Sequence, residues 1–191
     1  MLWVLGTSGL AREMAQLWRV LNGADAEVMF AAKSDEDLIQ AGSLAVLAVG
    51  ESHARLRLYE RGSSQWEFPT LVHPAADIGD SVVLGDGVVA TSGVVATTDV
   101  DVGDGSLLNW NVTLGHDVIV GRCCVINPQA AISGGVRLGP GVLVGAGAVV
   151  LEGRQVGAGA RVGAGAVVTH DVEPGATVVG NPARLLSRSN P

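Results

Sequence analysis

Aromatic residues are scarce in this chain of 191 residues: they make up 4% of it, although 48% of the residues are hydrophobic. A core built around large rings is therefore excluded, and the 27 glycines indicate a repeat built on small side chains instead. Cysteine is also rare. Cys123 and Cys124 are the only two and are adjacent, so we expect no disulfide framework and a reducing, cytoplasmic location.

Positive charge is the second scarcity, with 12 Lys and Arg against 19 Asp and Glu and a net charge of −7. Such a surface repels nucleic acid and anionic membranes, so we expect neither as a partner. Glycine and charged residues interrupt every apolar window, and we therefore expect no membrane span. No secretory signal precedes the first expected strand, and because no membrane span is expected, a soluble protein is predicted.

The first 70 or so residues alternate between strand and helix patterns. Apolar strands are expected at 1–6, 26–32 and 44–50, and helices at 10–22 and 52–62. This alternation predicts a small parallel sheet. The turn "GTSG" (6–9) and Gly50 both follow strands, and so should meet at the carboxyl edge, where such sheets bind ligands. A short glycine turn also closes a strand-to-helix connection without binding anything, and that alternative stays open.

A six-residue period runs from Ile78 to Val168. Each of its sixteen positions is Ile, Leu or Val, except Ala90 and Ala96. The residue three positions after each of these sixteen is Gly nine times and Asp or Asn four times. These residues tolerate positive φ, so each hexad should be a short strand closed by a left-handed corner. Stacked hexads bury aliphatic ladders, and a β-helix is predicted.

The repeat resembles that of the left-handed β-helix acyltransferases, in which three hexads form one triangular turn, and "PGATVVGNPARLL" (174–186) is similar to their closing segment. The N-terminal pattern, followed by Asn109 and His116–Asp117, resembles more narrowly the family of sialic-acid O-acetyltransferases and nucleotide-amino-sugar N-acetyltransferases. This resemblance implies a small N-terminal α/β Rossmann-like domain at 1–72, which binds the acceptor. A left-handed parallel β-helix with a C-terminal tail would follow at 73–191.

The resemblance implies that His116 is a general base and that Asp117 supports it. Imidazole can take a proton from an attacking amine or hydroxyl at neutral pH, and a neighbouring carboxylate strengthens it as a base. Adjacent side chains of a straight strand point apart, so Asp117 can reach His116 only across a corner. The repeat alone allows the alternative that His116 is a solvated corner residue.

Eighteen residues per turn, taken from the resemblance, place residues eighteen apart on top of one another at about 4.8 Å. His116 then stacks on Gly134, and Asn109 on Asn127. We expect these polar residues to face a strip of bare backbone that holds the pantetheine arm of acetyl-CoA, with the Gly134 N–H binding the oxyanion. The expected acetyl-CoA contacts are Asn109, Asn127, Gly134, Ala146, Ala164 and Arg184.

The acceptor is expected at the N-terminal turn, with Trp110 as a further wall of its pocket. The expected contacts are Thr7, Ser8, Gly9, Gly50 and Trp110. Alternatively, Trp110 is buried at a subunit contact. The family's "GxSGHG" reads "GTSGLA" here, with Leu10 in place of the histidine. Its two aspartates after the second strand are Ala31 and Ala32, and its second histidine is Val125. We therefore expect weaker or different recognition of the base than in the family.

The resemblance predicts a homotrimeric, acetyl-CoA-dependent acetyltransferase acting on a nucleotide-linked amino-sugar in surface glycan synthesis. The alternatives are a sugar O-acetyltransferase of the sialic-acid type and a structural β-helix without chemistry. A zinc carbonic anhydrase on the same fold needs three histidines around one metal. His116 and His170 share a column but lie three turns apart, about 14 Å, so no metal site is expected.

Overall fold

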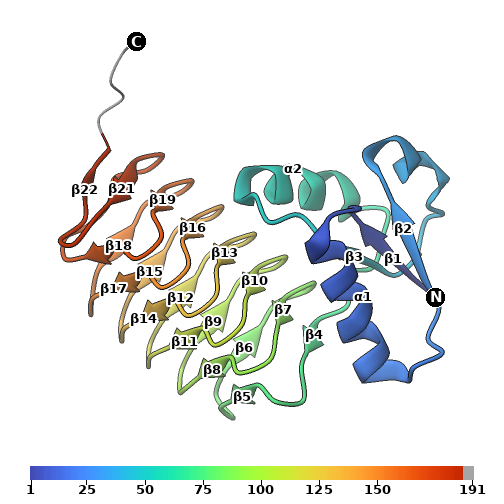
Figure 1. Ribbon diagram of the computed structural model, residues 1–191, viewed down its shortest axis with the longest axis horizontal. Helices are drawn as coiled ribbons and strands as arrows, with labels where there is room; N and C mark the ends of the chain where they lie inside the picture. Colours follow the sequence, from blue (N-terminus) through green and yellow to red (C-terminus); the bar gives the residue numbers. More distant parts are fainter. Residues whose placement is uncertain (187–191) are drawn as a thin grey trace.

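The computed structural model describes residues 1–186 and divides into an N-terminal α/β part and a long coil (Figure 1). The N-terminal part has a three-stranded parallel sheet in the order β2-β1-β3. Its elements are β1 (Leu2–Leu5), α1 (Gly9–Asn22), β2 (Val28–Ala31), the 3-10 helix η1 (Lys33–Leu38), β3 (Ala45–Leu47) and α2 (Ser52–Gly62). The expected three strands and two helices are confirmed, whereas η1 was not predicted.

The coil is a parallel β-helix of the left-handed type, built from strands of two or three residues that form three sheets, here called faces 1, 2 and 3. Face 1 contains β4 (Leu71–Val72), β7 (Val89–Ala90), β10 (Leu107–Leu108), β13 (Val125–Ile126), β16 (Leu143–Val144), β19 (Arg161–Val162), β21 (Thr177–Val179) and the antiparallel β22 (Arg184–Leu185). Face 2 contains β5 (Asp77–Ile78), β8 (Val95–Ala96), β11 (Thr113–Leu114), β14 (Ala131–Ile132), β17 (Val149–Val150) and β20 (Val167–Val168). Face 3 contains β6 (Val83–Leu84), β9 (Asp101–Val102), β12 (Ile119–Val120), β15 (Arg137–Leu138) and β18 (Gln155–Val156).

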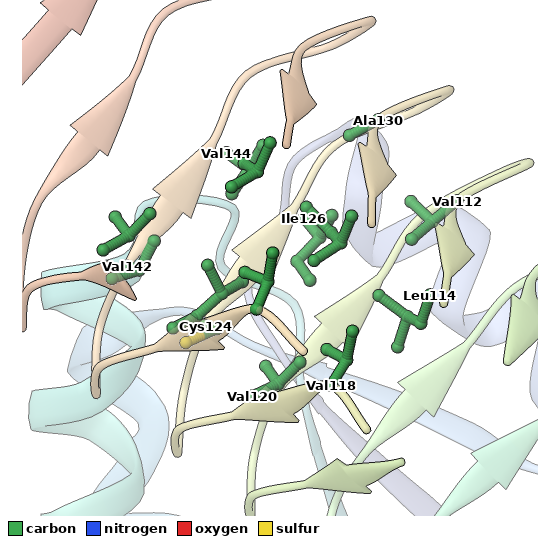
Figure 2. Close-up of a cluster of buried hydrophobic side chains, with 14 of the residues drawn as sticks. Val112, Leu114, Val118, Val120, Cys124, Ile126, Ala130, Val142 and Val144 are labelled. Carbon is green, nitrogen blue, oxygen red and sulfur yellow. The ribbon is translucent and has the colours of Figure 1, made fainter. Parts of the chain in front are cut away.

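The strand register confirms the eighteen-residue turn, since Leu107 pairs with Val125 on face 1 and Thr113 with Ala131 on face 2. The second residue of each of these strands points inward, so Leu108, Leu114 and Ile126 are all buried in one continuous core. Figure 2 shows these aliphatic ladders stacking along the coil axis. The first strand, β4, pairs with β7 and so already belongs to face 1.

Three rows of corners join the faces and are named here by one member each. The Trp110 corner (91–93, 109–111, 127–129, 145–147, 163–165) joins faces 1 and 2. The His116 corner (97–99, 115–117, 133–135, 151–153, 169–171) joins faces 2 and 3, and the Cys123 corner (85–87, 103–105, 121–123, 139–141, 157–159) joins faces 3 and 1.

Positive φ angles occur at these corners, as the repeat predicted. Asp99, Asn111 and Asp117 adopt them, together with the nine repeat glycines. The expectation was wrong at Asp171, which has no positive φ, and Cys123 and Gln129 adopt the conformation instead. The stacked ladders therefore impose the corner geometry even on residues that do not favour it.

The N-terminal part packs on the coil through both helices (Figure 1). Met14 and Leu17 of α1 pack with the outward residues Leu107 and Val125 of face 1. Helix α2 lies along the Cys123 corner, where its Tyr59 borders Gly105. A larger residue in place of Gly105 would displace Tyr59. The N-terminal part thus covers face 1 from β4 to β16, while it does not cover faces 2 and 3.

Arg55 of α2 is fully buried at this junction. Its Nη1 donates to the carbonyls of Leu47 (3.0 Å) and Val49 (3.1 Å), and its Nε donates to the carbonyl of Gly105. Burial lowers the pKa of Arg55 to about 10, so it is still a cation at neutral pH. One guanidinium therefore joins the end of β3 to the coil.

Candidate active site

His116 and Asp117 form a hydrogen-bonded pair at the exposed corner between β11 and β12. Asp117 has a φ of 58°, which turns its side chain back so that Oδ2 lies 2.7 Å from Nδ1 of His116. An ionised carboxylate only accepts, so Nδ1 carries the proton and Nε2 keeps its lone pair. The hydrogen bond and charge of Asp117 raise the pKa of His116. The pair therefore has the tautomer that a general base requires.

Gly134 lies directly under the imidazole, as the eighteen-residue stacking predicted. A β-carbon at this position would be 2.5 Å from Nε2 of His116, so glycine is the residue that leaves room for the ring. The N–H of Gly134 makes no hydrogen bond within residues 1–186. It is therefore a free donor beside the base. The next residue in this column is Glu152, whose charge adds to the rise in the pKa of His116.

The expected single cluster of polar residues is wrong. Asn109 and Asn127 lie at the Trp110 corner, with strand β11 between them and His116. The interval from residue 109 to residue 116 spans more than one hexad, so it crosses a complete strand and reaches the next corner. Asn109 Oδ1 accepts from the Trp110 N–H, and Asn127 Nδ2 donates to the Val144 carbonyl. Both amides thus brace their own corner.

The bare strip exists, but it runs along the Trp110 corner and not below His116. Trp110, Pro128 and Ala146 stack there, because the amides of Gln129 and Gly147 donate to the carbonyls of Trp110 and Pro128. Ala146 and Ala164 are exposed along this row. Toward the C-terminal end the residues of this strip are small, and their side chains leave the backbone nearly bare. An extended chain can therefore approach it closely.

Arg184 does not lie on this strip. It is exposed in β22 and lines a cavity of about 570 Å³ at the C-terminal end of the coil, together with His170 and Leu185. Within residues 1–186, its Nη1 donates only to the neighbouring Ala183 carbonyl. The arginine is therefore available to an anion that reaches the end of the coil.

The turn after β1 and the end of β3 meet at the carboxyl edge of the N-terminal sheet. The Ala48 amide donates to the Leu5 carbonyl, and Leu10 borders Gly50. Thr7 lines a cavity of about 450 Å³ at this edge, whereas Ser8, Gly9 and Gly50 lie outside its lining. Ser8 makes no side-chain cap to α1.

Sequence reasoning missed the charged wall of this cavity. It is formed by Lys33, Glu36, Arg57 and Arg61, with Ala31 and Ala32 beside them. Arg61 donates to Glu36, while Lys33 and Arg57 form no ion pair within residues 1–186. The helical spacing of Ala54, Arg57, Leu58 and Arg61 was the available signal, because it places all four on one face of α2.

A second cavity of about 200 Å³ lies between α1 and the Trp110 corner. Trp110 is 42% exposed and forms part of its wall. Sequence reasoning proposed Trp110 but missed the α1 side, because the contact joins segments about a hundred residues apart.

Among residues 1–186, no group of three or more His, Cys, Asp or Glu is arranged to hold a metal ion. The same part of the chain contains no helix that is long and apolar enough to cross a membrane.

Comparisons with known proteins add to this geometry. Residues 135–170 match the family "Bacterial transferase hexapeptide (six repeats)". No curated protein sequence matches the chain significantly.

Solved structures, in contrast, match almost the whole chain. PerB from Caulobacter crescentus, solved with CoA and GDP-perosamine, is 25% identical and has a TM-score of 0.88; the alignment covers 97% of each chain. A mutant of perosamine N-acetyltransferase from the same organism is also 25% identical, with a TM-score of 0.87, covering 97% of this chain and 96% of the other. The acetyltransferase domain of PglB from Neisseria gonorrhoeae is 28% identical with a TM-score of 0.87, covering 97% of this chain and 98% of the other.

WeeI from Acinetobacter baumannii is 26% identical with a TM-score of 0.85, covering 97% of this chain and 99% of the other. The likeness thus extends over the α/β part as well as the coil. The matching repeat and these whole-chain likenesses show a hexapeptide-repeat chain whose architecture, over almost its whole length, is that of acetyltransferases such as perosamine N-acetyltransferase and the PglB domain.

Proposed function

We propose that the protein transfers an acetyl group from acetyl-CoA to the amine of a nucleotide-linked amino-sugar, in surface glycan synthesis. The observation that carries the proposal is Nε2 of His116, held as an acceptor by Asp117 and placed over the free N–H of Gly134. The complexes of the Caulobacter enzyme with CoA and GDP-perosamine, and of the PglB domain with acetyl-CoA, support the donor and the class of acceptor.

His116 would act twice in this reaction. Its Nε2 takes a proton from the acceptor amine as the nitrogen attacks the thioester carbonyl. The Gly134 N–H donates to the oxygen of the resulting tetrahedral intermediate. When the intermediate collapses, the C–S bond breaks and the imidazolium returns its proton to the CoA thiolate. The products are the N-acetyl sugar and CoA, and His116 is neutral again.

A homotrimer would bring the two separated corners together. From β8 to β20, face 2 carries the uncharged outward side chains Val95, Thr113, Ala131, Val149 and Val167, and its one charged outward residue is Asp77 in the first strand β5. Face 3 instead carries Asp101 and Arg137, and face 1 is covered by the N-terminal part. Packing three copies with face 2 toward a threefold axis places the His116 corner of one protomer against the Trp110 corner of the next.

Acetyl-CoA would then lie between two protomers. Its pantetheine arm runs along the strip that contains Asn109, Asn127, Ala146 and Ala164, and its thioester reaches His116 and Gly134 of the neighbouring copy. Arg184, at the end of the coil, is the proposed cation for a CoA phosphate. A single protomer cannot supply both walls, because the two corners are separated by face 2.

The N-terminal part, residues 1–72, is proposed as a reduced Rossmann-like domain that binds the acceptor, with residues 73–191 as the acyltransferase domain. Thr7, Ser8, Gly9 and Gly50 lie at or beside the carboxyl edge of the sheet, where Lys33 and Arg57 offer charges for a diphosphate. The use of acetyl-CoA supports a cytoplasmic location.

A panel of nucleotide-linked amino-sugars with acetyl-CoA, followed by thiol release, tests the function. We expect turnover with at least one amine, a product whose acetyl group resists hydroxylamine, and loss of turnover in His116→Ala. Release of the acetyl group by hydroxylamine would identify an ester and contradict N-acylation. No thiol release with any sugar would contradict the whole proposal.

A further inference from the structure

The cavity between α1 and the Trp110 corner has the composition of a carbohydrate site. Trp110 offers a half-exposed aromatic face, and its neighbours on the coil are His73, Thr91 and Ser92. Helix α1 contributes Glu13 and Gln16 beside the apolar Met14, Leu17 and Val20. An aromatic face flanked by hydroxyl, amide and carboxylate groups can stack on the apolar face of a sugar ring and bind its hydroxyls and amine.

The polar groups of this cavity are largely unused by the protein itself. The side chains of Glu13, Gln16 and Ser92 form no hydrogen bond within residues 1–186. His73 accepts the Ala75 N–H at Nδ1, 3.0 Å away, so its Nε2 carries a proton that it can donate. A ligand in the cavity thus finds one carboxylate acceptor and several donors without breaking a protein contact.

The cavity also lies on the correct side of the proposed transfer point. Along the Trp110 corner, Ala146 and Ala164 continue from Trp110 toward the C-terminal end, where the thioester arm is placed. His73 and Ser92 continue in the opposite direction. Donor and acceptor must meet at the base from different sides. Trp110 is in the same turn of the coil as His116, so it lies between the strip that runs toward the C-terminal end and the cavity on the opposite side.

We propose that this cavity binds the amino-sugar ring of the acceptor, stacked on Trp110 and held by Glu13, and thereby sets which sugar is acetylated. The proposal rests on the function proposed above. The cavity volume of about 200 Å³ is below the 300–1,000 Å³ of sites for drug-sized ligands. It therefore suits a single sugar ring.

The test compares Trp110→Ala, Trp110→Phe and Glu13→Gln with the wild type. Met29→Ala is the matched control, because Met29 is 46% exposed on β2, away from both cavities. We expect Trp110→Ala to raise the KM for the amino-sugar nucleotide about tenfold, and Glu13→Gln to raise it less. Trp110→Phe should retain most of the affinity. The KM for acetyl-CoA should not change in any variant.

Calorimetry without acetyl-CoA separates this inference from the proposed function. The amino-sugar nucleotide should bind Trp110→Ala more weakly than the wild type, while the matching nucleoside diphosphate, which lacks the sugar, binds both equally. Equal weakening of the diphosphate would overturn the proposal and place the nucleotide here. Suppose that light scattering shows loss of the trimer in Trp110→Ala, and that affinity falls only as far as the loss of trimer explains. Trp110 would then be a subunit contact, and the proposal would be overturned.

An unchanged affinity of Trp110→Ala for the amino-sugar nucleotide would also overturn the proposal. Absence of turnover with intact sugar binding would contradict only the proposed function.

Discussion

Nε2 of His116 lies so close above Gly134 that a β-carbon on this glycine would be 2.5 Å from it. The nearest clashing atoms all belong to the imidazole, and Gly134 has no positive φ. An alanine is therefore compatible with the backbone and incompatible only with the present position of the ring. This contact links a backbone donor to the proposed base and makes their spacing testable.

Gly134→Ala should leave the fold intact and lower kcat, because the methyl group displaces the imidazole from the thioester. We expect a loss of at least about tenfold, in the range attributed to misplaced acid–base groups. Circular dichroism and light scattering verify fold and assembly, and steady-state kinetics give kcat. A folded variant with the wild-type kcat would show that the ring position over Gly134 is unimportant.

The pH profile tests the pair of His116 and Asp117. Because Asp117 raises the pKa of His116, the acidic limb of kcat/KM should lie above the usual histidine value of about 6.5. The base must be neutral, so activity falls as the pH drops through this pKa. Asp117→Asn removes the charge, and its limb should move to lower pH with a reduced maximum.

His116→Ala is the reference for that profile and should lower kcat by about 100-fold or more. Its fold should survive, since an exposed corner side chain contributes nothing to the buried ladders. An acidic limb that stays at the same pH in Asp117→Asn would show that the Asp117 carboxylate does not affect the pKa of the titrating group.

Mixed assemblies test whether the active site lies between protomers. His116→Ala removes the base, and Ala146→Trp should block the strip at an exposed position, so each variant alone should be inactive. After co-expression, a trimer pairs an intact His116 corner of one copy with an intact Trp110 corner of its neighbour. Part of the activity should therefore return. Absence of any recovery in verified mixed trimers would place both groups in one protomer's site.

Arg55 should hold the N-terminal part on the coil. Arg55→Met leaves the carbonyls of Leu47, Val49 and Gly105 without their donor, and we expect the free energy of unfolding to fall by about 2–4 kcal/mol. Arg57→Met, on the same helix, is the control and should change it by no more than about 0.5 kcal/mol. Urea denaturation measures both. An Arg55→Met protein as stable as the wild type would show that burying the charge costs as much as its hydrogen bonds return.

The six-residue period determined the coil, because each hexad needs only its own small corner and its own aliphatic residue to join the ladders. The same local logic predicted that Asp117 can reach His116 only across a left-handed corner, and the eighteen-residue turn implied by the family resemblance predicted that Gly134 lies below it. The separation of Asn109 from His116 was also contained in the numbering, since seven residues exceed one hexad. The prediction was wrong because it treated residues that stack in one column as equivalent to residues at successive corners of the same turn.

Only the tertiary structure decided how the non-repeating part meets the coil. The burial of Arg55, the charged cavity beside Arg57 and the cavity between Glu13 and Trp110 all depend on contacts between segments far apart in the sequence. No period relates such segments. Their positions follow from the shapes of the side chains of α1 and α2 against face 1 and the Cys123 corner, and packing of this kind is settled only when all partners are present.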